Sequence, residues 1–184
     1  MLRFLYTIVF SIFIDWEKLL NLLKPEPRLI PFEKEQIDFL LNEVRSPEIL
    51  TQCAGTSFHF PLDSISICAH LSRPEIHAFL LVDDEHAIGY GDLLKDGDKE
   101  IRICRLLISS KRRGKGYGKM LVQHLCNKAR SLYPTLPLRL FVIDENQAAL
   151  HCYLNSNFKL TGIKKVLPDS MPPVNILQME YYED

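Results

Sequence analysis

The stretch Lys111-Arg112-Arg113-Gly114-Lys115-Gly116-Tyr117-Gly118-Lys119 holds five cations and three glycines within nine residues. It follows an apolar segment, Ile101 to Ile108, that predicts a strand. It leads into a segment, about Gly116 to Leu132, whose apolar residues fall on one helical face. Glycines let the backbone approach a ligand, and the first N–H groups of a helix have no internal partner. The stretch therefore predicts an anion site, most naturally for a phosphate or pyrophosphate.

Two common phosphate motifs do not fit this loop. A Walker A loop has a glycine five residues before its Gly-Lys pair and then a Ser or Thr, but here Arg113 precedes Gly118 by five and Met120 follows Lys119. A Rossmann fingerprint needs a glycine three residues after Gly116, where Lys119 stands. A plain solvated turn is the other reading, yet three alternating glycines are costly for a mere surface loop.

The segment Arg113 to Gly118 reads R-x-x-G-x-G and resembles the signature of the GNAT superfamily of acetyltransferases. Downstream, Asn146, Ala149, Tyr153 and Phe158 resemble that family's N-x-x-A-x-x-x-Y-x-x-x-G-F segment. Asn157 replaces the usual glycine, a mild departure because Asn also tolerates the left-handed conformation that ends a helix. The resemblance covers residues 28–182 in element order.

The resemblance implies acetyl-coenzyme A (acetyl-CoA) as co-substrate and names the residues that bind it. The main chain of the strand before the loop would pair with the pantetheine arm, and the loop amides would bind the pyrophosphate. Asn146 would cap a helix, about Asn146 to Ser156, and offer its amide to pantetheine. The expected cofactor-binding residues are Leu106, Leu107, Ile108, Arg113, Gly114, Lys115, Gly116, Tyr117, Gly118, Lys119 and Asn146.

Tyr153 is the expected general acid. It lies two helical turns after Asn146 and therefore on the same face. A phenol held near the thioester sulfur can protonate the departing thiolate. The alternative is an ordinary core aromatic.

The expected general base is Glu100. Several family members use a glutamate on the fourth strand, but Arg102 stands at that position here. Strand alternation puts Glu100 on the same face as Arg102, Cys104 and Leu106. Asp92 on the neighbouring strand is a second candidate; either acid could instead be an exposed strand-end carboxylate, and an amine that arrives deprotonated needs no base. Arg102 would recognise an acidic group on the substrate or pair with Glu100.

The segment order predicts an α/β fold: one domain with a mixed, mostly antiparallel sheet flanked by helices, as in GNAT acyltransferases. Leu138 to Ile143 is nearly continuously apolar, as expected of a strand covered on both faces. The stretch Ser46 to Pro61 is expected to be irregular. Expected strands span 28–32, 77–82, 87–94, 100–109, 138–143, 159–167 and 174–182, with helices over 33–44, 63–71, 116–132 and 146–156.

Residues 1–25 form a separate expectation, an extra amphipathic helix over about 3–24 that Pro25 and Pro27 end. Its apolar run is shorter than the roughly 20 residues that span a bilayer. Packing on the domain, dimerisation and lying on a membrane surface are open roles, as is a cleaved or mis-assigned start. Residues 26–184 would form the acetyltransferase domain.

Composition narrows the function further. A net charge of −1 over 184 residues disfavours nucleic acid as a partner. The five scattered cysteines and six dispersed histidines predict a reduced, cytoplasmic protein without a metal site.

The expected activity is transfer of the acetyl group to a primary amine of a small molecule or a protein, by direct attack in a ternary complex. The alternative is a non-catalytic acyl-CoA binding or sensing module on the same fold. The segment Ser46 to Leu71 is expected to line the acceptor site, with Phe58, His59 and Phe60 as its wall.

Overall fold

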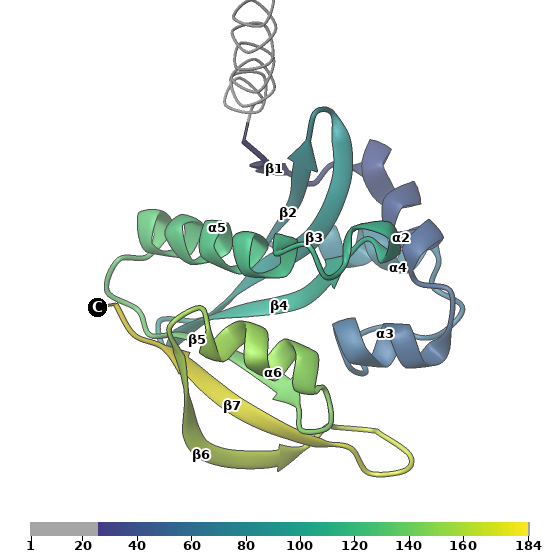
Figure 1. The fold of residues 1–184 in the computed structure, drawn as a ribbon. Coiled ribbons are helices and arrows are strands. Elements are labelled where there is room, and N and C mark those ends of the chain that lie inside the picture. Colours follow the sequence, from purple (N-terminus) through teal and green to yellow (C-terminus); the bar gives the residue numbers. More distant parts are fainter. Residues whose placement is uncertain (1–25, 184) are drawn as a thin grey trace, which may run out of the picture.

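The computed structural model describes residues 26–183, which form one seven-stranded sheet (Figure 1). The strand order is β1-β2-β3-β4-β5-β7-β6, and only the β4–β5 pair is parallel. The predicted mixed, mostly antiparallel sheet is therefore confirmed. The strands are β1 Arg28–Pro31, β2 Ile76–Asp83, β3 His86–Asp96, β4 Glu100–Ile108, β5 Leu138–Ile143, β6 Phe158–Val166 and β7 Asn175–Tyr181.

The helices also follow the expected order, with one addition. They are η1 Lys34–Gln36, α2 Ile37–Glu43, α3 Pro47–Ala54, α4 Ser64–Leu71, η2 Ser110–Arg112, α5 Tyr117–Leu132 and α6 Gln147–Leu154. The prediction of an irregular Ser46 to Pro61 was wrong, because α3 lies there. Ser46 Oγ accepts a hydrogen bond from the N–H of Ile49 at 3.3 Å, Pro47 opens the helix, and Leu50 is buried beneath it.

Two hydrophobic cores lie on opposite faces of the sheet. On one face, α5 and α6 pack on the strands through residues such as Leu121, Leu125 and Tyr153. On the other, α2, α3 and α4 contribute Leu40, Leu50, Ile67 and their neighbours. The helices therefore divide between the two faces, as Figure 1 shows.

β3 lets α5 approach closely because it has glycines on the face toward that helix. A Cβ on Gly91 would lie 2.7 Å from Leu125 Cδ1 and 2.8 Å from Leu106 Cδ2. A Cβ on Gly89 would lie 2.7 Å from Ile108 Cδ1. Only glycine therefore fits under this part of the helix without displacing a neighbour.

β4 bulges in the middle. Asp92 pairs with Cys104 and Tyr90 with Leu107, so β4 has one residue more than β3 between these pairs. Arg105 takes up the extra length with a φ of +51°. The bulge reverses the alternation, so the prediction that Leu106 shares a face with Glu100 was wrong: Leu106 packs toward α5, in the core opposite to the one that holds Leu107.

β4 and β5 separate soon after they pair. Their parallel register covers only three pairs, from Ile101 with Leu138 to Ile103 with Leu140. Among the described residues, no strand pairs with β4 beyond Ile103 on the edge that faces β5. The sheet is therefore open between the carboxyl halves of these two strands.

β5 differs from its prediction as well. Leu138, Leu140 and Val142 are buried, whereas the alternate residues Arg139, Phe141 and Ile143 are only partly covered. One face of β5 belongs to the core, and the other lines a cavity described below. The apolar run therefore did not mean that both faces are packed.

The expected helix over residues 3–24 lies outside the described residues, so its existence, its roles and the domain boundary at residue 25 stay predictions. Within residues 26–183, no helix is both long and apolar enough to cross a bilayer. No cluster of potential metal ligands occurs in that same range. The cytoplasmic location stays a prediction too.

Candidate active site

The glycine-rich loop between β4 and α5 is anchored at its start by α2. Glu43, the last residue of α2, accepts hydrogen bonds from Ser109 Oγ and from the N–H of Ser110, both at 2.7 Å. Partial burial opposes ionisation, but these bonds outweigh it and lower the pKa of Glu43 below its ordinary value. Arg113 Nε donates to the carbonyl of Ile108 at 3.1 Å and folds the loop back on β4.

The loop has the backbone of an anion cradle. Gly114 and Gly116 have φ of +72° and +83°, and a Cβ on either would meet no atom within 4 Å. Gly116 is the N-cap of α5, and no side chain caps the helix there. The first N–H groups of this 16-residue helix therefore face the loop without a side-chain partner, at the positive end of its dipole.

A cleft of about 320 Å³ lies beside this loop. We call it the loop cleft; β4, α3, α5 and α6 form its walls. Of the predicted site residues, the structure brings eight together here: Leu106, Leu107, Ile108, Arg113, Gly114, Gly118, Asn146 and Tyr153. Sequence reasoning missed the contribution of α3, whose Ile49, Gln52 and Cys53 also line it.

Four of the predicted cofactor-binding residues do not line the loop cleft: Lys115, Gly116, Tyr117 and Lys119. Lys115 and Lys119 are exposed. The Tyr117 hydroxyl donates to Asp83 Oδ2 at 2.9 Å, which ties the start of α5 to the end of β2. The side chain of Tyr117 therefore fixes the loop in place.

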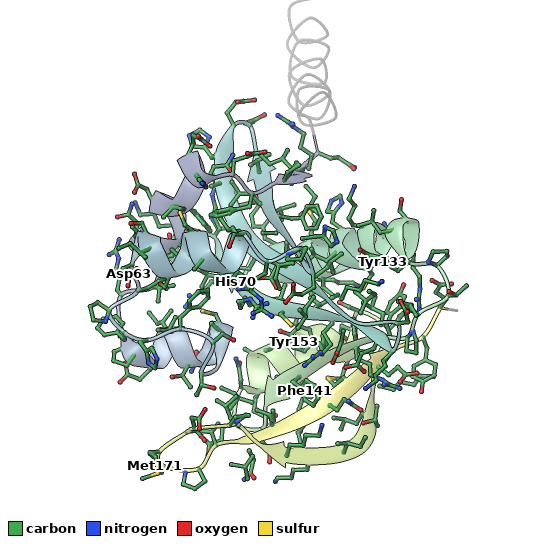
Figure 2. The ribbon with its side chains drawn as sticks, turned by 180° about the vertical axis from the view of Figure 1, so that it is seen from behind. Asp63, His70, Tyr133, Phe141, Tyr153 and Met171 are labelled. Carbon is green, nitrogen blue, oxygen red and sulfur yellow. The ribbon has the colours of Figure 1, made fainter. Side chains whose placement is uncertain are left out.

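Asn146 and Tyr153 lie on one face of α6, as the helical period predicts, and both line the loop cleft. Asn146 Oδ1 caps the helix by accepting from the N–H of Ala149 at 3.1 Å. Asn157 has the expected left-handed backbone, with a φ of +64°. Tyr153 lies in the interior of the protein and packs on Phe158 (Figure 2). Burial raises the pKa of Tyr153 well above its ordinary value, so its hydroxyl stays protonated.

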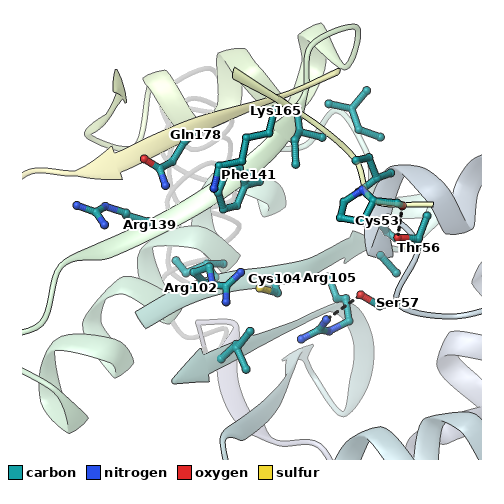
Figure 3. Close-up of a pocket in the computed structure, with 18 of the residues that line it drawn as sticks. Cys53, Thr56, Ser57, Arg102, Cys104, Arg105, Arg139, Phe141, Lys165 and Gln178 are labelled. Carbon is teal, nitrogen blue, oxygen red and sulfur yellow. Dashed lines mark hydrogen bonds between the residues drawn. The ribbon is translucent and has the colours of Figure 1, made fainter. Parts of the chain in front are cut away.

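A second cavity, of about 720 Å³, lies where β4 and β5 separate (Figure 3). We call it the arginine cavity, because Arg102, Arg105 and Arg139 are among its walls. The carboxyl end of α3 together with the residues that follow it, from Thr51 to Ser57, and the β6–β7 connection complete it. Gln52 and Cys53 line both cavities, so the two meet at α3.

Glu100 lies in the wall of the arginine cavity, held by cations. Its Oε2 accepts from Arg139 Nη1 at 2.7 Å. Its Oε1 lies 3.2 Å from Arg102 Nε without the alignment of a hydrogen bond. Arg102 Nη2 donates to Asp96 Oδ2 at 2.6 Å, and Arg139 Nε to Glu180 Oε2 at 2.7 Å. The expected pairing of Arg102 with Glu100 is thus present as an ion pair.

Asp92, the second candidate base, is buried in the protein interior. Its carboxylate is fully buried and accepts two hydrogen bonds from Arg105, at 2.6 and 2.8 Å. Tyr90 Oη and His70 Nε2 each lie 3.1 Å from its Oδ2. It does not line either cavity. A carboxylate enclosed in this way has no access to an acceptor amine.

The aromatic residues expected to wall the acceptor site lie elsewhere. Phe58 packs on His70, with ring centroids 5.3 Å apart, and Phe60 is largely exposed. Neither lines the arginine cavity, and His59 does not either. The part of the expected segment Ser46 to Leu71 that faces the arginine cavity is Thr51 to Ser57.

Thiols line both cavities, and burial makes them unreactive. It raises the pKa of Cys53 to about 11 and that of Cys104 to about 12. The pKa of Cys152, in the loop cleft, is raised for the same reason. All five cysteines are free of disulfides.

Comparison with known proteins gives the family. A family model described as the acetyltransferase (GNAT) family matches residues 16–158. The structure is similar to that of spermidine N-acetyltransferase from Vibrio cholerae in complex with CoA and spermine, with a TM-score of 0.72 and 16% identity over 84% of this chain and 94% of that one. It is also similar to a chimera of that enzyme, SpeG, with hSSAT, with a TM-score of 0.71 and 16% identity over 85% and 95% of the chains.

Because the family model spans most of the chain, the protein belongs to the GNAT acetyltransferase family. The predicted enzyme class, an acetyl-CoA-dependent N-acetyltransferase, and acetyl-CoA as its co-substrate are confirmed with it.

Proposed function

We propose that this enzyme transfers the acetyl group of acetyl-CoA to a primary amine by direct attack in a ternary complex. The observation that carries the proposal is that the loop cleft and the arginine cavity meet at Gln52 and Cys53. A donor in the first and an acceptor in the second can therefore reach each other through the gap between β4 and β5. When bound, acetyl-CoA supplies a thioester whose carbonyl carbon the amine attacks.

The residues around the loop cleft suit the cofactor. The uncapped N–H groups at the start of α5 would bind its pyrophosphate, and the open space at Gly114 and Gly116 leaves room for it. The unpaired edge of β4 at Leu106 to Ile108 would hold the pantetheine arm by main-chain hydrogen bonds. Asn146 uses its side-chain oxygen to cap α6, which leaves its amide hydrogens for the same arm.

We propose Tyr153 as the general acid. Its hydroxyl is protonated because burial raises its pKa, and it lies in the wall of the loop cleft. As the bond to sulfur breaks, the phenol would give its proton to the departing thiolate. The lost proton would then be recovered from solvent.

We propose Glu100 as the group that receives the proton of the amine, directly or through one water molecule. Of the two candidate carboxylates it is the one that lines the arginine cavity. Arg139 fixes its orientation through the 2.7 Å hydrogen bond. Its other oxygen, Oε1, forms an ion pair with Arg102 at 3.2 Å but accepts no hydrogen bond from it, and would take the proton.

A covalent acetyl-cysteine is disfavoured by the thiols themselves. Acyl transfer to sulfur needs a thiolate, and the raised pKa values of Cys53, Cys104 and Cys152 keep them as thiols near neutral pH. The amine is therefore the direct nucleophile.

The arginine cavity, at about 720 Å³, has the size of a small-molecule site. The similar solved structures are spermidine N-acetyltransferases, one of them bound to spermine. We infer a small-molecule amine as the acceptor, in preference to a protein.

Release of CoA with a panel of primary amines tests the activity. Double-reciprocal plots of the initial rate, with acetyl-CoA and the amine both varied, should give intersecting lines. Mass spectrometry should find the acetyl group on the amine. An acetylated enzyme, or parallel lines, would contradict direct transfer. Tight acetyl-CoA binding without turnover on any amine would mark the protein as a binding module.

A further inference from the structure

Cations outnumber carboxylates in the arginine cavity. Two acidic side chains line it, Asp96 and Glu100. Six basic side chains line it as well: Arg73, Lys99, Arg102, Arg105, Arg139 and Lys165. Three of them, Arg73, Arg105 and Arg139, also pair with carboxylates behind the wall, and Lys99 and Lys165 belong to no ion pair found within residues 26–183. Several come from segments far apart in the sequence, and Figure 3 shows Arg102, Arg139 and Lys165 around the same space.

Both of these carboxylates are already engaged. Asp96 accepts from Arg102 at 2.6 Å, and Glu100 accepts from Arg139 at 2.7 Å. A polyamine that entered the cavity would bring a second positive charge. It would have to displace an arginine from one of these pairs to find a carboxylate, which costs a partly buried guanidinium one of its two carboxylate partners.

Donors, in contrast, remain available. Arg102 Nε is buried and makes no hydrogen bond in the described part of the chain, although it lies 3.2 Å from Glu100 Oε1 in an ion pair. The Lys165 ammonium lies 5.3 Å from the centre of the Phe141 ring and belongs to none of the ion pairs found within residues 26–183. Lys99 is exposed at the same cavity. An anion placed here would give the two lysines a charged partner.

We propose that the acceptor is a primary amine that also carries an anionic group, a carboxylate or a phosphate, and that the arginine cavity binds this group. The inference rests on the acetyl transfer proposed above and names its substrate class. The spermidine N-acetyltransferases share this enzyme's fold, but at 16% identity this likeness does not extend to the acceptor. Their acceptor therefore does not carry over to a cavity with this charge.

Paired acceptors test the proposal. Each pair keeps the amine and removes the anion: an α-amino acid against its amide, a peptide that begins with Asp against one that begins with Asn, and glucosamine 6-phosphate against glucosamine. Spermidine serves as the cationic comparison. We expect kcat/KM, from CoA release, to favour the anionic member of at least one pair by roughly tenfold or more, and to exceed that of spermidine. The preferred pair identifies the anion. Equal rates within every pair, or spermidine as the best acceptor, would overturn the proposal.

Two lysines next to each other on β6 provide a matched pair of variants. Lys165→Gln removes a cation of the cavity, and we expect the preference for the anionic acceptor to fall by roughly 3- to 10-fold. Lys164→Gln removes the same charge outside the cavity, where Lys164 pairs with Asp144 at 2.7 Å, so the preference should persist. The preference should also weaken as salt is raised, because Lys165 is exposed. Loss of preference in both variants, or in neither, would contradict a specific anion site.

Calorimetry on the CoA-loaded protein separates failure of this inference from failure of the proposed activity. Binding of the anionic acceptor without turnover would refute acetyl transfer to it and support the anion site. Equal acetylation of charged and neutral amines would refute the anion site and support the activity. Calorimetric affinities should fall in Lys165→Gln and not in Lys164→Gln.

Discussion

Removing the hydroxyl of Tyr153 tests whether this residue is a proton donor or only a core aromatic. Tyr153→Phe keeps the ring against Phe158, so acetyl-CoA affinity by calorimetry should change little. If the phenol donates, kcat should fall by roughly 10²–10⁴, and kcat/KM with it, because the interaction matters only as charge develops on sulfur. This corresponds to about 3–5 kcal/mol of activation barrier. Tyr182→Phe makes the same change at an exposed residue and should be silent. A Tyr153→Phe enzyme with unchanged kcat would leave water as the acid.

Glu100 can be tested against a residue that shares its structural role. Glu100→Gln should lower kcat by roughly 10²–10⁴ near neutral pH, and the deficit should shrink as pH rises toward the pKa of the acceptor amine, which then needs no base. Glu180→Gln is the control, because Glu180 also holds Arg139, at 2.7 Å, but does not line the arginine cavity. Similar losses in both variants, with no change in pH profile, would mean that Glu100 only orients Arg139.

Sequence reasoning found the residues whose positions depend on one element. Asn146 and Tyr153 share a face of α6 because the helical period fixes it, and the left-handed Asn157 follows from local conformation. Arg139 and Lys165 were missed, because only the register of distant strands brings them to the same cavity. Nothing in the local pattern of either residue signals this.

The contact between α2 and the glycine-rich loop predicts an effect on cofactor binding. Glu43→Gln removes the carboxylate that accepts from Ser109 and Ser110, which should weaken acetyl-CoA binding by roughly 3- to 10-fold, since hydrogen bonds to a charged group are among the stronger ones. Because the pKa of Glu43 is lowered in the folded protein, its contribution to stability is present above the unfolded value near 4.5 and is lost as pH falls through the folded value.

Urea unfolding at pH 7 and at about pH 3.5 checks the second part of this prediction. The stability difference between wild type and Glu43→Gln should be largest at pH 7 and should diminish in acid. Glu35→Gln, an exposed glutamate of η1, is the matched control and should alter neither property. Unchanged acetyl-CoA affinity in Glu43→Gln would show that the loop holds its shape without this anchor.

The close packing of α5 on β3 links the core to the loop cleft. In Gly91→Ala the new methyl group would press on Leu125 and on Leu106, and Leu106 lines the cleft. We expect a loss of about 1–3 kcal/mol in the free energy of unfolding, together with weaker acetyl-CoA binding. In Gly97→Ala the methyl group meets no atom within 4 Å, so that variant should lose stability only through its positive φ and should bind acetyl-CoA normally. Normal affinity in Gly91→Ala would mean that Leu106 moves away from the cleft.

Two elements, α3 and the bulge in β4, differ from what the sequence pattern predicted. The signals of α3 were in the sequence, since Ser46, Pro47 and Glu48 are favourable at a helix start, and they were overlooked because the helix is short. The bulge at Arg105 had no such signal. Arg105 adopts a positive φ while its guanidinium pairs with the buried Asp92, a contact between two strands. Alternation arguments assume an uninterrupted strand, so every face assigned beyond such a bulge is reversed.

At the scale of the whole molecule, the order of elements and the sheet class could be predicted because each strand and most helices have their own apolar period. The gap between β4 and β5 could not be predicted, because nothing in the sequence of either strand marks the residue at which their pairing ends. The arginine cavity occupies this gap, so its lining was harder to predict than that of the loop cleft.

The three residue pairs that join β4 to β5 also have a consequence for amide exchange. Main-chain N–H groups along an unpaired strand edge exchange with deuterium faster than those inside a ladder, even when the strand lies in the middle of a sheet. The amide hydrogens around Leu106 to Ile108 should therefore exchange as fast as those of an edge strand. Bound CoA should slow this exchange and that of β5 together, because it would bridge two half-sheets that otherwise open independently. Protection confined to the glycine-rich loop would mean that the halves already move as one body.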